Sequence, residues 1–75
     1  MTKEALIEQV QAHGYSVDFS LEEDCLYCQE NGNRYLPEHF SIEGSFPFFE
    51  NGQQKMLRTV QSTKHGLTGY YIQTA

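Results

Sequence analysis

The chain has 75 residues, of which 39% are hydrophobic and 20% are charged, and its formal net charge at pH 7 is −5. A chain of this length holds one domain with one modest core, which excludes a multi-domain enzyme, and the composition is globular rather than disordered. No apolar run approaches the ~20 residues of a membrane span, and the N-terminal residues lack a secretion-signal pattern. With two cysteines and no such signal, we expect residues 1–75 to form a single cytoplasmic domain without membrane contact.

The charge is distributed unevenly along the chain. Ten acids and two bases give residues 1–50 a balance of −8, whereas three bases and no acid give residues 51–75 a balance of +3. Phosphate backbones are bound by clustered lysine and arginine side chains. Three bases on a strongly acidic body are a weak pattern of that kind, so nucleic acid is not the expected partner.

The first predicted element is a helix over residues 3–13. Leu6 and Val10 recur at helical spacing, and Thr2 can cap the first turn. Gly14 can end the helix in the left-handed conformation that glycine adopts without strain.

The clearest strand follows, because apolar and polar residues alternate over residues 15–22. One face of this strand is therefore expected to be buried, with Phe19 under the helix against Leu6 and Val10. Asp18 is expected to face solvent on the other side.

A hairpin is predicted next. The runs 25–29 and 34–36 flank Asn31-Gly32, and Asn-Gly between two such runs is a strong hairpin signal. A single tight turn is predicted over residues 37–40, where the fixed φ of a proline is suitable.

The C-terminal half is predicted to form three more strands, joined by a second Asn-Gly turn and by a Lys-His-Gly turn; the strands are residues 41–50, 55–63 and 67–74. Gly44 and Pro47 interrupt the first of these, which is therefore expected to be bulged or to lie at a sheet edge. Together the elements predict an α+β fold, with one N-terminal helix packed on a four- to six-stranded antiparallel meander sheet.

Three segments carry a family resemblance: GYSVDFSLEEDCLYC (14–28), LPEHFSIEGSFPFFE (36–50) and STKHGLTG (62–69). They resemble a group of small bacterial proteins of uncharacterised function, frequent in Bacteroidetes, whose pattern runs G-Y, D-F-x-L, D-C-L-x-C, P-x-x-F, F-x-F-E and H-G-x-x-G. Some members carry the label phosphoribosylpyrophosphate synthetase. The resemblance implies a small bacterial protein, and its motifs bring no catalytic residue with them.

The residues do not support that label. Diphosphoryl transfer needs a glycine-rich or acidic loop that holds phosphates and Mg²⁺. The chain has no Gly-x-Gly-x-x-Gly, no Gly-Lys-Ser/Thr and no acidic pair beside glycines at a strand end. We therefore expect a protein that is not an enzyme and that uses no cofactor.

Cys25 and Cys28 are the most conspicuous chemical pair. A reactive thiolate needs nearby positive charge, whereas residues 22–24 are acidic. A zinc site needs four ligands, and His39 and His65 are the candidates for the other two. Positions i and i+3 of a strand face opposite sides, so we expect packed thiols and no metal. A metal- or thiol-dependent module built on the two cysteines is the first alternative function.

The aromatic residues suggest an interaction surface. A helix of about 11 residues covers only about half of one face of a five-stranded sheet. Some aromatics outside the expected core are therefore expected to stay exposed, and the candidates are Tyr27, Tyr35, Phe49, Tyr70 and Tyr71. Exposed apolar patches of several hundred Å² usually mark contact sites. The expected function is contact with another protein or with a second copy of the chain.

Two other features of the sequence bear on the function of these aromatics. Tyrosines on a sheet can also stack nucleic-acid bases, so weak single-stranded nucleic-acid binding through the C-terminal hairpin, with Arg58 and Lys64, is the second alternative. Strong curling of the sheet would hide more aromatic surface, and Gly44, Pro47 and Gly69 are the residues that permit it.

Overall fold

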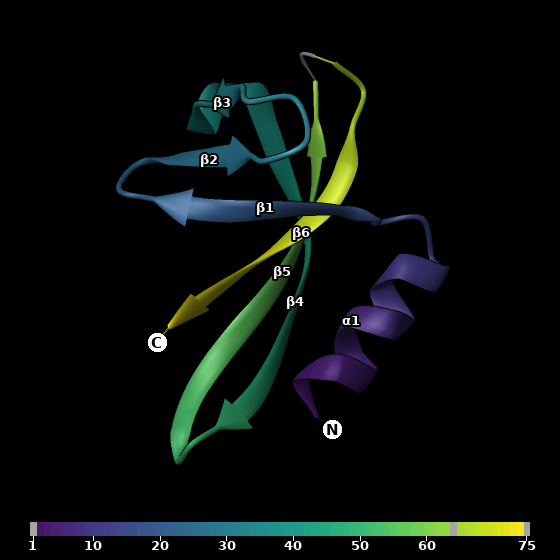
Figure 1. Ribbon diagram of the computed structural model, residues 1–75, viewed down its shortest axis with the longest axis vertical. Helices are drawn as coiled ribbons and strands as arrows, with labels where there is room; N and C mark the ends of the chain where they lie inside the picture. Colours follow the sequence, from purple (N-terminus) through teal and green to yellow (C-terminus); the bar gives the residue numbers. More distant parts are fainter. Residues whose placement is uncertain (1, 64, 75) are drawn as a thin grey trace.

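The structure is a computed structural model that describes residues 2–63 and 65–74, and in these residues it has one helix and one six-stranded sheet (Figure 1). The helix α1 spans Lys3–Ala12. The strands are β1 (Val17–Glu22), β2 (Cys25–Cys28), β3 (Arg34–Tyr35), β4 (Phe40–Glu50), β5 (Gln53–Ser62) and β6 (Thr68–Thr74), and a 3-10 turn, η1 (Pro37–His39), precedes β4. The predicted α+β class with a single N-terminal helix is confirmed.

The strand order is β3-β2-β1-β6-β5-β4. All neighbouring strands are antiparallel except β1 and β6, which run parallel and pair at Val17↔Gly69 and Asp18↔Tyr70. The predicted meander is therefore wrong at the centre of the sheet. The sheet consists of two meanders, β1–β3 and β4–β6, which are joined by the parallel pairing of β1 with β6. Local alternation predicts strands but not which strand edges meet.

The ends of α1 follow the sequence closely. The Thr2 side chain accepts a hydrogen bond from the Ala5 backbone N–H at 3.2 Å, and His13 is the C-terminal cap. Gly14 has φ 99° and donates its N–H to the Gln11 carbonyl. The predicted cap and stop are both confirmed, and the helix ends one residue before the predicted boundary.

The turns also follow the sequence. Asn51 and Gly52 both have positive φ, 53° and 76°, as a two-residue hairpin turn requires. In the β2–β3 loop only Gly32 has positive φ, and Asn31 instead accepts a hydrogen bond from the Asn33 N–H through its side chain at 2.9 Å. The first Asn-Gly therefore lies in a longer loop than a two-residue turn.

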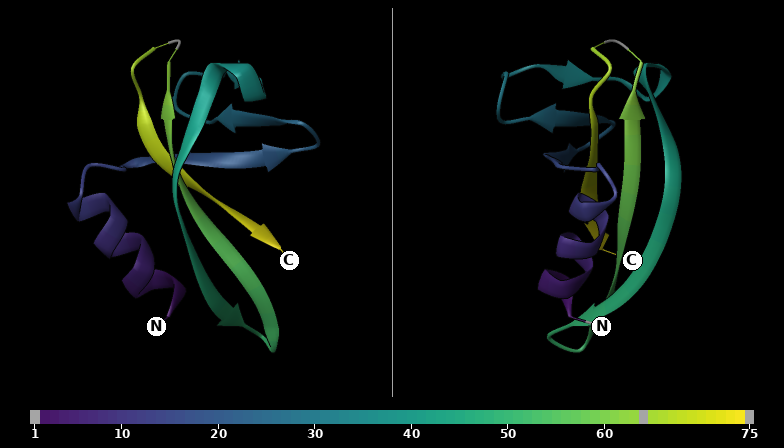
Figure 2. Two further views of the ribbon diagram at one scale, coloured as in Figure 1. Left: turned by 180° about the vertical axis from the view of Figure 1, so that it is seen from behind. Right: turned by 90° about the vertical axis from the view of Figure 1, so that its right-hand side faces the viewer.

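Strands β4–β6 have two faces, which the register defines because residues paired across strands share a face. The helix face, covered by α1, carries Gly44, Phe46, Phe48, Glu50, Lys55, Leu57, Thr59, Tyr70 and Ile72. The open face, on the opposite side, carries Phe40, Ile42, Ser45, Pro47, Phe49, Gln54, Met56, Arg58, Val60, Ser62, Gly69, Tyr71 and Gln73. Strands β1–β3 cross one end of the open face, as Figure 1 and Figure 2 show.

Two apolar clusters form the core. The first lies between α1 and the helix face and consists of Leu6, Val10, Phe48, Leu57 and Tyr70. The second lies between β1–β3 and one end of the open face and consists of Val17, Phe19, Leu26, Cys28, Tyr35, Val60 and Tyr71. Phe19 is buried and Asp18 is exposed, as predicted. The prediction that Phe19 packs against Leu6 and Val10 is wrong, because the curled sheet carries Phe19 to the opposite face.

Gly69 permits this curl. A Cβ at position 69 would collide with the Val17 carbonyl oxygen and would lie 2.7 Å from Cε2 of Phe19. Only glycine therefore allows β6 to approach β1 closely enough for the parallel pairing. Gly44 lies at the β4 irregularity, where the register with β5 shifts between Ile42 and Gly44. The predicted bulge and edge position of this strand are both confirmed.

Within residues 2–63 and 65–74, no helix has the length and apolar character needed to cross a membrane.

Candidate functional site

Strands β1–β3 leave part of the open face uncovered. This part carries the most exposed large apolar side chain of the described strands. Phe49 has 72% of its surface accessible, the largest value among the large hydrophobic residues, and Ile42 has 46%. Pro47, between them on β4, is also exposed, and Met56 beside it is half-buried. Ile42 lies beside Val60 and is separated from Pro47 by Ser45, whereas Pro47, Met56 and Phe49 form an apolar group that reaches the end of the β4–β5 hairpin.

Pro47 also shapes the outer edge of the sheet. Glu50 and Gln53 flank a two-residue turn and therefore form a hydrogen-bonded pair, and such pairs alternate along antiparallel strands. By this alternation Pro47, opposite Met56, lies in a non-hydrogen-bonded pair, so its nitrogen faces the free edge of β4. The edge lacks a donor at its middle, which opposes the addition of another strand.

Among the described residues of β4–β6, Arg58 is the only charged one on the open face. It pairs with Ser45 on β4 and with Tyr71 on β6, and it is half-buried. Its Nε is buried and has no hydrogen-bond partner among the described residues. Burial raises the pKa of the Tyr71 hydroxyl, and the nearby Arg58 charge partly offsets that rise. The cation therefore lies beside a buried aromatic ring, with its hydrogen-bonding capacity partly unused.

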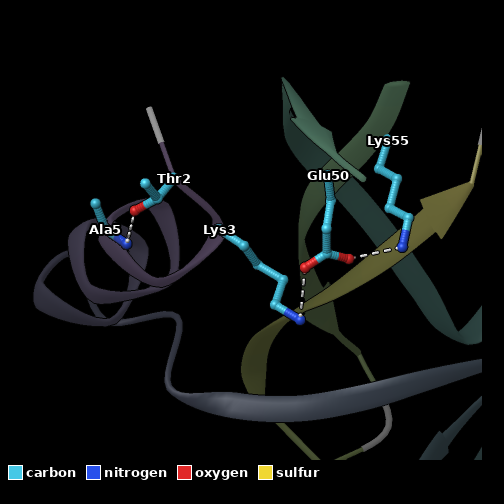
Figure 3. A network of polar contacts seen from close by, with 5 residues as sticks. All are labelled: Thr2, Lys3, Ala5, Glu50 and Lys55. Carbon is cyan, nitrogen blue, oxygen red and sulfur yellow. Dashed lines mark hydrogen bonds and ion pairs between the residues drawn. The ribbon is translucent and has the colours of Figure 1, made fainter. Parts of the chain in front are cut away.

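The helix face has the opposite character, because its charges are paired. Glu50 accepts from Lys55 Nζ at 2.7 Å and lies 3.1 Å from Lys3 Nζ, which connects the start of α1 to the end of the β4–β5 hairpin (Figure 3). The hydrogen bonds from Lys55 and Lys3 hold the pKa of Glu50 below its usual value of 4.5. This face is thus held together by packing and by ion pairs within the chain.

A groove of about 280 Å³ lies where α1 ends over the β4 irregularity. Its walls are largely apolar and include Leu6, Val10, Tyr15 and Phe46, with Glu43 at its border. Glu43 already accepts a hydrogen bond from the Ser41 hydroxyl at 3.2 Å. The groove has room for one side chain or a small molecule.

The five aromatics predicted to form an interaction surface are dispersed. Tyr35, Tyr70 and Tyr71 are buried, so the prediction of an exposed position is wrong for these three. Tyr27 is half-buried on the outer side of β2, with the Arg34 guanidinium carbon 5.7 Å from its ring centroid. Phe49 stays exposed. The sheet curls further than the coverage estimate allowed for and hides Tyr35 and Tyr71. On the other face of β6, Tyr70 is covered by α1.

Tyr35 has a polar role inside this curl. Its hydroxyl accepts from Asn31 Nδ2 at 3.1 Å and lies 2.8 Å from His65 Nδ1, while its ring packs edge-on against Phe19. One buried tyrosine therefore connects the β2–β3 loop to the β5–β6 loop. His65 takes part in this connection through Nδ1.

The predicted metal candidates are not brought together. Cys28 is fully buried on the core side of β2, whereas Cys25 is half-buried on the other side, near Arg34. His39 lies in η1 and His65 contacts Tyr35. In the described ranges, no group of three or more histidine, cysteine or acidic residues has an arrangement that could hold a metal ion. The geometry of the described residues thus offers no support for a site built on the two cysteines.

Comparisons with protein-family models, with curated proteins and with solved structures found no match for this chain. The resemblance to small bacterial proteins therefore stays a prediction, and functional inference rests on the geometry of the chain itself.

Sequence reasoning missed Ile42, Pro47 and Arg58 as neighbours on one surface. The signal was the alternation along residues 45–50, which sends Phe46 and Phe48 to one face and Pro47 and Phe49 to the other. Phe46 is 40% accessible and lines the groove. Arg58 could be found only after the register placed it between Ser45 and Tyr71.

Proposed function

We propose that this protein is a small non-enzymatic domain that acts by contact with another protein, through the uncovered part of its open face. The observation that carries the proposal is the exposure of Phe49 at 72%, together with Ile42 and Pro47 on the same face. Exposed apolar groups gathered on one surface of a small domain usually mark a contact site.

The composition of the face favours protein as the partner. Interfaces are enriched in aromatic residues, methionine and arginine, and their centres are depleted in other charged residues. Phe49, Met56 and Arg58 all lie on this face, with Met56 between the other two, and the face has no acidic residue and no lysine among the described residues of β4–β6. A contact surface of this composition can be used without any catalytic group.

The contact is made by side chains rather than by extension of the sheet. An added strand needs a row of free backbone donors and acceptors along the edge. Pro47 removes the central donor of the β4 edge, so the face is available for a partner while the edge is protected.

The C-terminal hairpin is a weaker candidate for nucleic-acid binding. Base stacking needs aromatic rings exposed on a surface with basic neighbours, and Tyr70 and Tyr71 are both buried. Both cysteines are free thiols, and this fits the reducing conditions of the proposed cytoplasmic location.

Site-specific photo-crosslinking in the native host tests the proposed contact. A benzophenone amino acid at position 49 should give discrete protein adducts larger than the chain itself. The same group in place of Glu8, an exposed residue of α1 on the opposite side of the sheet, is the matched control. Equal adduct patterns from the two positions, or none from position 49, would contradict the proposal.

A further inference from the structure

We infer that the open face binds an acidic segment of another protein, in which a carboxylate flanked by apolar side chains pairs with Arg58. The inference rests on the proposed function and names the chemistry of the partner. Its basis is the state of Arg58 relative to the other cations of the chain.

Arg58 is the exception among the described lysines and arginines. Lys3 and Lys55 share Glu50, and Arg34 lies 3.4 Å from Glu22. No ion pair within residues 2–63 and 65–74 includes Arg58, although the chain has twice as many acids as bases. In so acidic a chain, an arginine without an internal carboxylate is available for one from outside.

The unused hydrogen-bond donor of Arg58 is its Nε–H group. Its Nε is buried without an acceptor among the described residues, and a donor in that state is unfavourable until an acceptor reaches it. A carboxylate matches the planar fork of a guanidinium and can accept two parallel hydrogen bonds from it. The acceptor that completes this group is therefore an oxyanion placed over the sheet.

The surroundings of Arg58 define the rest of the segment. Its neighbours on the open face are Ser45 directly opposite on β4, Tyr71 directly opposite on β6, and Met56 and Val60 along β5, with Pro47 diagonally on β4. Phe49 lies further along β4, at the end of the hairpin. Arginine surrounded by apolar and aromatic contacts is typical of the centre of a protein interface. The matching segment carries aliphatic or aromatic side chains beside its acid.

A second copy of the chain is a poorer occupant. In a symmetric dimer the same face meets itself. Because the open face has no aspartate or glutamate, such a dimer would oppose two Arg58 cations without a carboxylate between them. A polyanionic nucleic acid fits no better, since this face carries one cation on a chain of net charge −5.

The experiment is a selection of short random peptides displayed on phage against the full chain, followed by titration of the recovered peptides. We expect sequences that combine aspartate or glutamate with aromatic or aliphatic residues. Replacing the acid of a recovered peptide by its amide, and separately Arg58→Gln, should each weaken binding by about tenfold or more. The two changes together should weaken binding by less than the product of the separate losses, because both remove one interaction.

Matched variants keep the result interpretable. Arg34→Gln removes the other described arginine, which lies on β3 and pairs with Glu22, and it should leave the affinity unchanged. Arg58→Lys retains the charge but not the fork, and it should restore only part of the affinity. Amide shifts on adding a recovered peptide should centre on Ser45, Phe49, Arg58 and Tyr71, and the unbound spectra show whether each variant is folded.

The outcomes separate this inference from the proposed function. Peptides that shift the open face but lack acids, or that bind Arg58→Gln equally well, would overturn the inference and leave the contact function standing. Concentration-dependent shifts of the open face without peptide would assign it to a second copy, with the same consequence. Peptides that bind only the groove beside α1, a failure to recover any peptide, or displacement by a single-stranded oligonucleotide would overturn both.

Discussion

The two faces of strands β4–β6 are covered by different means. On the helix face, α1 packs over Phe48, Leu57 and Tyr70, and Lys3 pairs with Glu50. On the open face, the chain's first three strands curl over one end and leave the other end exposed. A helix that lies along the strands buries the side chains over its whole length. A curled sheet buries only the side chains that its own strands cross. In a domain this small, the exposed remainder is the surface that we propose contacts a partner.

The largest effect is expected where the curl itself is removed. Phe19→Ala deletes a ring that is buried in the second cluster and packed edge-on against Tyr35, and it should destabilise the fold by about 3–5 kcal/mol. Asp18→Ala, one residue earlier and exposed, should change the free energy of unfolding by less than about 1 kcal/mol. Urea unfolding measures both, and similar losses would mean that the assigned register of β1 is wrong.

Gly69→Ala should have the next largest effect, because it separates the two meanders without removing apolar surface. The new Cβ collides with the Val17 carbonyl, and we expect a loss of about 1–3 kcal/mol. In Gly44→Ala the nearest atoms are side-chain atoms of Thr59 and Phe46, 3.1 and 3.2 Å away, which can shift. Gly44→Ala is the control, and it should lower the free energy of unfolding by less than about 1 kcal/mol. A control loss as large as that of Gly69→Ala would show that close approach at β1–β6 is not the cause.

The ion pairs of the helix face predict a smaller, acid-dependent effect. Because the pKa of Glu50 is lower in the folded state than its usual 4.5, its contribution to stability is present above that pH and is lost as the pH falls through the folded value. Glu50→Gln should therefore be less stable than the parent near neutral pH, and the difference should shrink in acid. Since Glu50 is accessible to solvent, added salt should shrink it too. A difference that persists unchanged at low pH would contradict the assignment.

The smallest effect on stability is expected on the open face. Phe49→Ser should change the free energy of unfolding by no more than about 0.5 kcal/mol, because its ring is 72% accessible. Phe48→Ser, at the adjacent residue, removes a ring buried under α1 and should cost several kcal/mol. Thermal unfolding of this pair compares the two faces directly. If Phe49→Ser is strongly destabilising, its ring contributes to folding and is not a free contact surface.

Features that depend on residues close together in the sequence were predicted correctly more often than features that depend on residues far apart in the sequence. The cap at Thr2, the stop at Gly14 and the turn at Asn51-Gly52 depend on a few neighbouring residues, and all three are confirmed. The position of Phe19 depends on a pairing between residues 17 and 69, and it was wrongly predicted. The candidate site has the same division, since the exposure of Phe49 was predicted from the sequence, whereas the place of Arg58 on the same face was not.

The sequence by itself determined the helix, the turns and the alternation that gives each strand two faces, because these follow from backbone conformation and from the period of apolar residues. Only the tertiary structure decided that β1 meets β6, that Tyr35, Tyr70 and Tyr71 are buried, and that Arg58 has no carboxylate partner among residues 2–63 and 65–74. The physical reason is that each of these depends on the edge-to-edge pairing of segments far apart in the chain. That pairing is selected by the close approach at Gly69 and by the fit of the whole core, and no local pattern encodes either.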